Sequence, residues 1–370
     1  MGNSCGSTAS ERYATSEQKS RPGGAPICFA GPHAEMATGV CATGRAGEWV
    51  SCDDAGSIAL VQWASGGAIE WWAGHAKSAT RVASAAWLDG AVSASRDATI
   101  RVWRRGALAA PTATFTGHDL TVSALALSHS EAGRVFSGSR DSSVRLWDAS
   151  TGACISSCYV ARNVVTSAAW VKGESSCVWQ GSEDLRLRLW DVRDMAKPAA
   201  VLEGYTCFPT CLDAADHLCV SGSNGFSGGG GGGGCELRVW DRRFLRQEVL
   251  LTAHEYAVTG VALLSPTSIA SASRDGTLHL WSSSGADGSE LSGLEADGRG
   301  LDQNRSKSQQ ATGVWRVLDT TQLGAAATCL AAARTDEPAS RLYAASANGA
   351  VRAFGVEGSR LRELCVAEPS

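Results

Sequence analysis

The sequence lacks a run of about 18 or more apolar residues that could cross a membrane, and its polar N-terminus has no signal-peptide core. It contains thirteen cysteines but no Cys-X-X-Cys pair, so neither a zinc site nor a disulfide framework is indicated. Strong charge of one sign is also missing, because the net charge is only −4. We therefore expect a cytoplasmic protein with reduced thiols that binds no nucleic acid, metal, cofactor or small-molecule substrate.

Tryptophan, by contrast, is abundant, and it ends near copies of one short motif. The clearest copies are "SASRDATIRVWR" (93–104), "SGSRDSSVRLWD" (137–148), "QGSEDLRLRLWD" (180–191) and "SASRDGTLHLWS" (271–282). Weaker copies occupy 51–63, 221–241 and 344–355. The strand-ending aromatic residues are Trp63, Trp103, Trp147, Trp190, Trp240, Trp281 and Phe354. Most are separated by about 40–45 residues, the length of one four-stranded propeller blade.

Within each repeat, short alternating runs bounded by Gly, Asp and Ser predict strands and not helices. Seven repeats therefore predict an all-β, seven-bladed β-propeller over 27–370, preceded by a disordered tail over 1–26. Two low-complexity segments, 223–234 and 282–313, are predicted to be flexible insertions. The outermost strand of the last blade is left open between "RLRELCVAE" (360–368) and the "PICFAG" segment near residue 27.

The repeats resemble the WD-repeat family, through Gly-His at 74–75 and 117–118, Ala-His at 253–254, the Ser-Arg-Asp turns and the Trp-Asp ends. The resemblance implies a hydrogen-bonded tetrad of His, Ser, Asp and Trp inside a blade. Complete sets are His75/Ser93/Asp97/Trp103, His118/Ser137/Asp141/Trp147 and His254/Ser271/Asp275/Trp281. A buried carboxylate needs hydrogen-bond donors, which His and turn amides supply, so we interpret these sets as structural and expect no catalytic residue and no enzyme activity.

Other blades depart from the tetrad pattern, and blades 1, 5 and 7 are predicted to be weaker for that reason. The departures are Ala55 in blade 1, Ala161 and Gln180 in blade 4, Tyr205 and Gly225 in blade 5, and Asn348 and Phe354 in blade 7. Blade 4 nevertheless keeps Asp184 and Trp190.

The resemblance also implies a partner surface, because the residue before each turn Asp points outward on the top face of such a propeller. These positions are Asp54, Arg96, Arg140, Glu183, Asn224, Arg274 and Ala347. The arginines suit an acidic peptide or loop of a partner protein, and the alternative is a solvated rim. Phe208 and Val164 are candidate apolar anchors beside the ring, and Phe226, in the glycine-rich loop, is another.

A narrower resemblance, to a cilium-associated member of the family, rests on "ARNVVT" (161–166), "SEDLRLRLWD" (182–191), "SNGF…GCE" (223–236) and the short N-terminus. It implies a non-enzymatic scaffold in ciliary or flagellar trafficking, connected with regulators of small GTPases. "MGNSCGS" offers Gly2 for myristoylation and Cys5 for palmitoylation, although Gly6 stands where the myristoylation pattern has Ser or Thr. The tail is thus a candidate membrane tether, or else it is untethered.

A different function is suggested by Trp-Asp-X-Arg, which in this family often marks substrate receptors of cullin-RING ubiquitin ligases. The motif occurs twice, as Trp190-Asp191-Val192-Arg193 and Trp240-Asp241-Arg242-Arg243. Under either reading we expect a monomer that acts within a larger complex.

Overall fold

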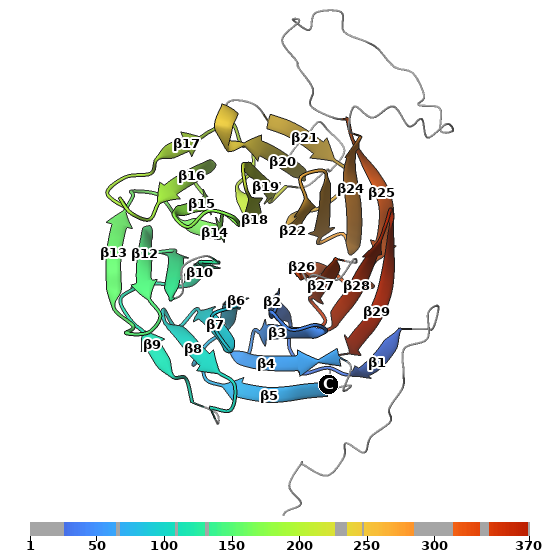
Figure 1. Cartoon of the computed structure of the whole chain (residues 1–370), viewed down its shortest axis with the longest axis horizontal. Coiled ribbons are helices and arrows are strands. Elements are labelled where there is room, and N and C mark those ends of the chain that lie inside the picture. Colours follow the sequence, from blue (N-terminus) through green and yellow to red (C-terminus); the bar gives the residue numbers. More distant parts are fainter. Residues whose placement is uncertain are drawn as a thin grey trace, which may run out of the picture.

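The computed structural model describes residues 26–63, 67–107, 110–129, 133–225, 235–245, 248–284, 314–333 and 340–368. These residues form seven β-sheets that radiate around a central axis, as Figure 1 shows. The predicted all-β, seven-bladed propeller is confirmed. Within the described ranges, no helix is long and apolar enough to cross a membrane.

Blades 1 to 6 are antiparallel four-stranded sheets whose strands follow chain order from the channel outwards. Blade 1 contains β2 (Ala37–Ala42), β3 (Glu48–Asp53), β4 (Ser57–Gln62) and β5 (Gly67–Ala73). Blade 2 contains β6 (Ala79–Ala83), β7 (Gly90–Ser95), β8 (Ile100–Arg104) and β9 (Ala113–Phe115). Blade 3 contains β10 (Val122–Leu127), β11 (Arg134–Ser139), β12 (Ser143–Asp148) and β13 (Cys154–Tyr159).

The next three blades repeat this plan. Blade 4 contains β14 (Val165–Trp170), β15 (Cys177–Ser182), β16 (Arg186–Asp191) and β17 (Ala200–Leu202). Blade 5 contains β18 (Pro209–Ala215), β19 (Leu218–Ser223), β20 (Glu236–Asp241) and β21 (Glu248–Thr252), with the 3-10 turn η2 (Arg242–Phe244) after β20. Blade 6 contains β22 (Val258–Ser265), β23 (Ser268–Ser273), β24 (Thr277–Ser284) and β25 (Val314–Gln322).

The two predicted insertions begin slightly too early, because Ser223 still belongs to β19 and β24 continues through Ser284. Both residues pair with a neighbouring strand, although the sequence around them is rich in Gly and Ser. Residues 226–234 and 285–313, like residues 1–25, lie outside the described residues.

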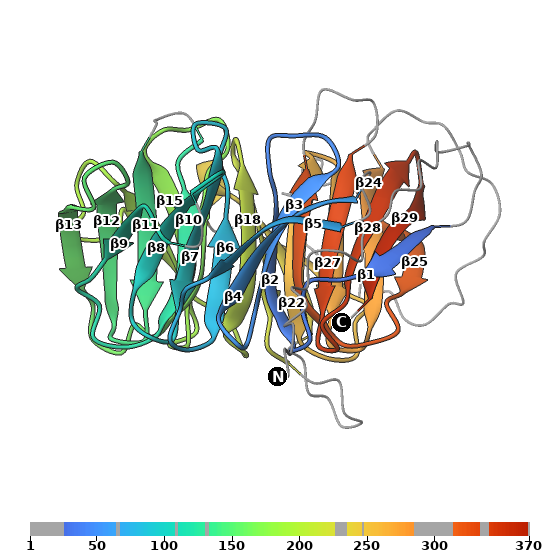
Figure 2. The ribbon, with the colours of Figure 1, turned by 90° about the horizontal axis from the view of Figure 1, so that it is seen from below.

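Blade 7 closes the ring and has five strands. It contains β26 (Ala327–Ala333), β27 (Arg341–Ser346), β28 (Val351–Glu357), β29 (Arg360–Glu368) and, outside β29, the N-terminal strand β1 (Ile27–Ala30). β1 is parallel to β29, with Ile27 opposite Cys365 and Ala30 opposite Glu368, and Figure 2 shows the two strands side by side. Both segments left open by the sequence therefore take part in closure, 360–368 as the regular outer strand and 27–30 as an addition.

A ring of side-chain hydrogen bonds also joins neighbouring blades around the channel. The second residue of every inner strand carries a hydroxyl, namely Thr38, Thr80, Ser123, Thr166, Thr210, Thr259 and Thr328. Each hydroxyl donates a hydrogen bond to the backbone carbonyl of the first residue in the inner strand of the next blade. The bond from Thr328 reaches the carbonyl of Ala37 and so connects the last blade to the first. We did not expect this ring from the sequence, although Ala, Val or Pro followed by Thr or Ser opens each inner strand.

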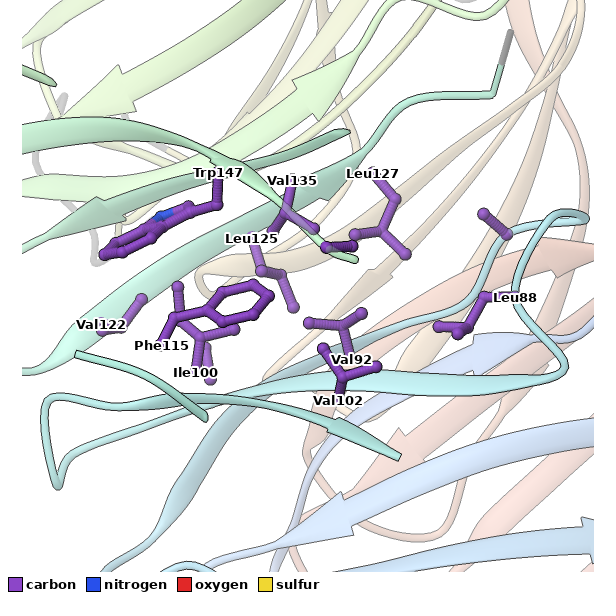
Figure 3. Close-up of a cluster of buried hydrophobic side chains, with 13 residues drawn as sticks. Leu88, Val92, Ile100, Val102, Phe115, Val122, Leu125, Leu127, Val135 and Trp147 are labelled. Atoms are coloured by element: carbon purple, nitrogen blue, oxygen red, sulfur yellow. The ribbon is translucent and has the colours of Figure 1, made fainter. Parts of the chain in front are cut away.

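The core lies between blades, and the motif tryptophans explain why. Trp147 of blade 3 stacks on Phe115, the last residue of the outer strand of blade 2, with ring centroids 5.5 Å apart. Both belong to the buried cluster drawn in Figure 3, with Ile100 and Val102 of blade 2. Trp103 meets Trp72 of blade 1 in the same way, at 6.0 Å. One blade alone would leave these rings in water, so the repeat is needed to bury them.

One sequence assignment in blade 1 is wrong. Trp63 lies beyond the end of β4, and Val61 takes the position that Trp103 has in blade 2, since Trp49 pairs with Val61 as Ala91 pairs with Trp103. The large aromatic residue of blade 1 lies instead on the neighbouring strand β3, where Trp49 is fully buried against Phe29 and Tyr343.

Candidate functional site

The structure brings the four residues of each predicted tetrad together. In blade 3, Nδ1 of His118 lies 2.9 Å from a carboxylate oxygen of Asp141, and Nε2 lies 2.8 Å from the hydroxyl of Ser137. The indole N–H of Trp147 donates to the same hydroxyl oxygen at 2.8 Å. Because that oxygen accepts from Trp147, its hydrogen is available for His118, whose Nδ1–H then donates to Asp141.

Blades 2 and 6 repeat this chain of contacts. His75 lies 3.0 Å from Asp97 and 2.7 Å from Ser93, whose hydroxyl accepts from Trp103 at 2.8 Å. The corresponding distances in blade 6 are 3.2 Å for His254 to Asp275, 2.7 Å for His254 to Ser271 and 2.9 Å for Trp281 to Ser271. The three sets therefore share one geometry.

The protonation states also agree with a structural role. Burial lowers the pKa of His75 and of His118 below 6.5 and keeps both imidazoles neutral at pH 7. Burial alone would raise the pKa of Asp97, but hydrogen bonds from Thr99 and His75 outweigh it and lower the pKa to about 2. A neutral ring donating to an ionised carboxylate is a satisfied buried pair.

The tetrad serines are unsuited to nucleophilic attack. Ser93, Ser137 and Ser271 are fully buried, and each hydroxyl is already engaged by His and Trp. A catalytic serine must reach a substrate carbonyl with its oxygen, which these cannot do. Within the residues that the structure describes, no group of three or more His, Cys, Asp or Glu could hold a metal ion.

Blade 1 contains a variant of the tetrad that sequence reasoning missed. His33 lies 2.9 Å from Asp53 and 2.7 Å from Ser51, and its side chain is fully buried. The carboxylate comes from Asp53 and not from the slot held by Ala55. His33 precedes β2 by the same four residues as His75 precedes β6, which is the signal that could have revealed it.

Blade 4 replaces the imidazole with an amide and a guanidinium. Asn163, two residues after the predicted slot at Ala161, accepts hydrogen bonds at 2.9 Å from both Gln180 and Arg188. Arg188 is buried and forms an ion pair with Asp184, while the indole of Trp190 donates to Gln180 at 3.1 Å. In this blade, Asn163, Gln180, Arg188 and Asp184 therefore take the place of the His–Ser–Asp set.

In blade 5, the hydroxyl of Tyr205 takes the place of the imidazole. It lies 2.6 Å from the hydroxyl of Ser221 and accepts from the indole of Trp240 at 2.8 Å. The carboxylate is supplied by Glu236 in β20, because Gly225 has none, and it pairs with Arg238 at 3.1 Å. Blade 7 has an apolar equivalent, in which Leu323, Ala344 and Phe354 are buried together.

The seven predicted top-face positions are structurally equivalent. Each backbone N–H donates, at 2.8–3.0 Å, to the carbonyl of the residue just before the inner strand of its blade. Val164 and Phe208 are two of the acceptors and are half-buried. Asp54, Arg96, Arg140, Glu183, Arg274 and Ala347 are exposed, and Asn224 is half-buried. Phe226, Gly2 and Cys5 lie outside the described residues.

Charge is not uniform around this top ring, which we define as those seven residues. Arg140 approaches Glu183 of the next blade at 3.5 Å, so its charge is partly compensated. Within the described residues, no ion pair joins Arg96 or Arg274 to an acid. These two arginines are the positive positions that remain available to a partner.

The Trp-Asp-X-Arg motifs lie on the opposite face, because β16 and β20 run away from the top ring. Trp190 and Trp240 are buried, whereas the side chains of Arg193 and Arg243 are 76% and 56% exposed. Each arginine folds back onto the aspartate of its own motif, at 2.6 Å for Asp191 and 2.5 Å for Asp241. The hydrogen bond from Arg193 lowers the pKa of Asp191. The two motifs therefore present the same arrangement on adjacent blades.

Two segments of the chain, 109–148 and 246–282, match the family described as WD domain, G-beta repeat. Each segment ends one residue after a tetrad tryptophan. It covers the outer strand of one blade and the three inner strands of the next. No curated protein matches the chain. With the seven-bladed architecture, the two matches support a WD-repeat family, whose propellers are generally non-catalytic scaffolds for protein interactions.

Proposed function

We propose that this protein is a non-catalytic interaction scaffold whose top ring binds an acidic segment of a partner protein. The observation that carries the proposal is the exposure of Arg96 and Arg274 without an acidic partner among the described residues. Guanidinium groups bind carboxylates through paired, charge-assisted hydrogen bonds, which give orientation as well as affinity. The ring residues are held by backbone hydrogen bonds, so little ordering is required before binding.

The proposal extends to a cellular role. The segments 161–166, 182–191 and 223–236 resemble WD repeat-containing protein 31, which supports a role in trafficking in cilia or flagella and contact with regulators of small GTPases. Lipids on Gly2 and Cys5 would tether the scaffold to a membrane, since two anchoring signals are needed for stable attachment. We accordingly propose a cytoplasmic and ciliary location.

Affinity purification from ciliated cells, with identification of partners by mass spectrometry, tests this function. The wild type is compared with the Arg96→Glu/Arg140→Glu/Arg274→Glu triple variant, after circular dichroism has shown that both fold. The matched control is Arg193→Glu/Arg243→Glu on the opposite face. Recovery of ciliary transport or GTPase-regulator proteins that is lost only in the top-ring variant supports the proposal. Equal recovery by all three proteins would refute it.

A second candidate function is a substrate receptor of a cullin-RING ubiquitin ligase. It is favoured by the matching Asp–Arg pairs on blades 4 and 5 and by Phe244, which is 55% exposed beside Arg243. In the same experiment, a cullin adaptor that is lost in the Arg193→Glu/Arg243→Glu variant and kept in the top-ring variant would favour this candidate.

A further inference from the structure

A cavity of about 290 Å³ opens at the mouth of the central channel and is lined by residues of four consecutive blades, among them the top-ring residues Arg96, Arg274 and Ala347. Its walls come from blades 6, 7, 1 and 2, and Arg274 and Arg96 stand at the two ends of this series. The blades between them contribute Met36, Ala326 and Ala347. None of the described residues that line the cavity is acidic.

A third guanidinium, that of Arg81, also lines this cavity. Arg81 is the third residue of its inner strand, at a β-bulge that all seven blades share. The other six blades have small residues there, namely Gly39, Ala124, Ser167, Cys211, Gly260 and Cys329. Among the described residues at this strand position, only Arg81 is therefore long and charged.

The contacts of Arg81 leave its charge uncompensated. Its guanidinium donates to the carbonyl of Thr80 at 2.9 Å and to that of Thr166, on blade 4, at 3.4 Å. No ion pair with a described acidic residue accompanies these bonds. A half-buried cation held only by neutral carbonyls gains from an anion, because partial desolvation strengthens their attraction.

We infer that the channel mouth binds a phosphate monoester group carried by a partner protein, with Arg81, Arg96 and Arg274 as its ligands. A phosphate monoester bears a charge of about −1.5 to −2 and has three strong acceptor oxygens, which match three guanidinium groups better than one carboxylate does. The inference rests on the proposed function and specifies the chemistry of the acidic segment. Phosphorylation would then control whether the partner is held.

The test uses the full chain and three pools of fluorescent peptides with randomised, acidic flanks. The pools are identical except for a central phosphoserine, serine or glutamate, and binding is followed by fluorescence anisotropy. Inositol hexakisphosphate is titrated separately as a free polyphosphate. The variants are Arg81→Gln, Arg96→Gln and Arg274→Gln, and the matched control is Arg104→Gln, whose exposed arginine ends β8 and lies outside both the cavity and the top ring.

The phosphoserine pool is expected to bind at least about tenfold more tightly than the other two pools. Each cavity variant is expected to reduce that affinity about tenfold, whereas Arg104→Gln is expected to change it less than about threefold. The variants are compared by thermal unfolding, so that a binding loss without a shift in melting temperature reports on the ligands.

The other outcomes distinguish failure of the phosphate site from failure of the proposed binding of an acidic partner. Equal binding of the phosphoserine and glutamate pools would overturn the phosphate site and leave an acidic partner in place. Binding of inositol hexakisphosphate without the phosphoserine pool would overturn a protein source for the phosphate. Binding of none of the probes would overturn this site, while the proposed function would still be decided by the partner purification.

Discussion

Removing the indole of Trp147 should destabilise the propeller strongly, because this side chain has both an apolar and a polar role. Its ring is 1% exposed and stacks on Phe115 of the preceding blade with centroids 5.5 Å apart. Its N–H donates to Ser137 at 2.8 Å and thereby fixes the hydroxyl that faces His118. Trp147→Ala leaves a cavity between two blades and removes one donor from a buried chain of hydrogen bonds.

The magnitude follows from the area that is buried. A tryptophan side chain buries roughly 150–250 Å², which at about 25 cal/mol per Å² corresponds to about 4–6 kcal/mol. Large-to-alanine substitutions of buried aromatic residues cost about 3–5 kcal/mol, because the surroundings relax only in part. We expect a loss of about 3–5 kcal/mol for Trp147→Ala. For Trp147→Phe, which keeps a ring, we expect about 1–2 kcal/mol.

Urea unfolding followed by far-ultraviolet circular dichroism measures these differences without relying on tryptophan fluorescence. Trp71→Ala is the matched control, because Trp71 is a tryptophan in the outer strand β5 of blade 1 and is 50% exposed. It should cost about 1 kcal/mol or less. A loss below about 1 kcal/mol for Trp147→Ala would mean that the ring is not buried between blades, and the packing described above would be wrong.

Three further predictions concern closure, the Gly-His motif and pH. Thr328→Val, which removes the hydrogen bond from blade 7 to blade 1, should cost about 0.5–1.5 kcal/mol. Thr114→Val on the exposed face of β9 is its control, and equal losses would contradict a closing role. Gly74→Ala should lower the urea midpoint, because a Cβ there would lie 2.0 Å from the ring of Trp103; an unchanged midpoint would refute the close approach. Burial, the largest cause, and repulsion from the imidazole of His254, the second, lower the pKa of His279 from 6.5 to about 4. The unfolded chain then takes up a proton that the folded state does not, so the stabilisation is complete above pH 6.5 and is lost as pH falls toward 4. His279→Gln should flatten the fall in unfolding free energy over that range, and a curve of unchanged slope would contradict the assignment.

The fold could be predicted from the sequence because the repeated residues act over short distances. Ser, Asp and Trp of one motif lie in one hairpin, so their spacing along the chain directly reflects their spacing in space. The histidine precedes the inner strand of the same blade at a constant distance, which placed His75, His118 and His254. Local geometry of this kind is legible in a single sequence.

What the sequence did not reveal depends on contacts between positions that no motif connects. Asn163 and Arg188 act together only because β16 returns beside the loop before β14, and Asn163 does not belong to the repeated pattern. The pairing of β1 with β29 joins opposite ends of the chain. Trp63 was assigned wrongly because it lies near the expected spacing along the chain. The buried tryptophan of blade 1 is instead Trp49 on the adjacent strand, opposite Val61.

Seven equivalent positions make the differences between blades informative, because the backbone around each position is the same. Arg140 and Arg274 hold the same ring position and make the same backbone hydrogen bond, yet only Arg140 has an acidic neighbour on the next blade. Similarly, an inner-strand position that six blades fill with small residues is filled by Arg81 in blade 2. A propeller needs neither arrangement for closure, since the hydroxyl ring and the tryptophans are present regardless of them. Residues that break an otherwise uniform ring without repairing a packing or hydrogen-bond defect are therefore the strongest candidates for binding, and here they converge on one mouth of the channel.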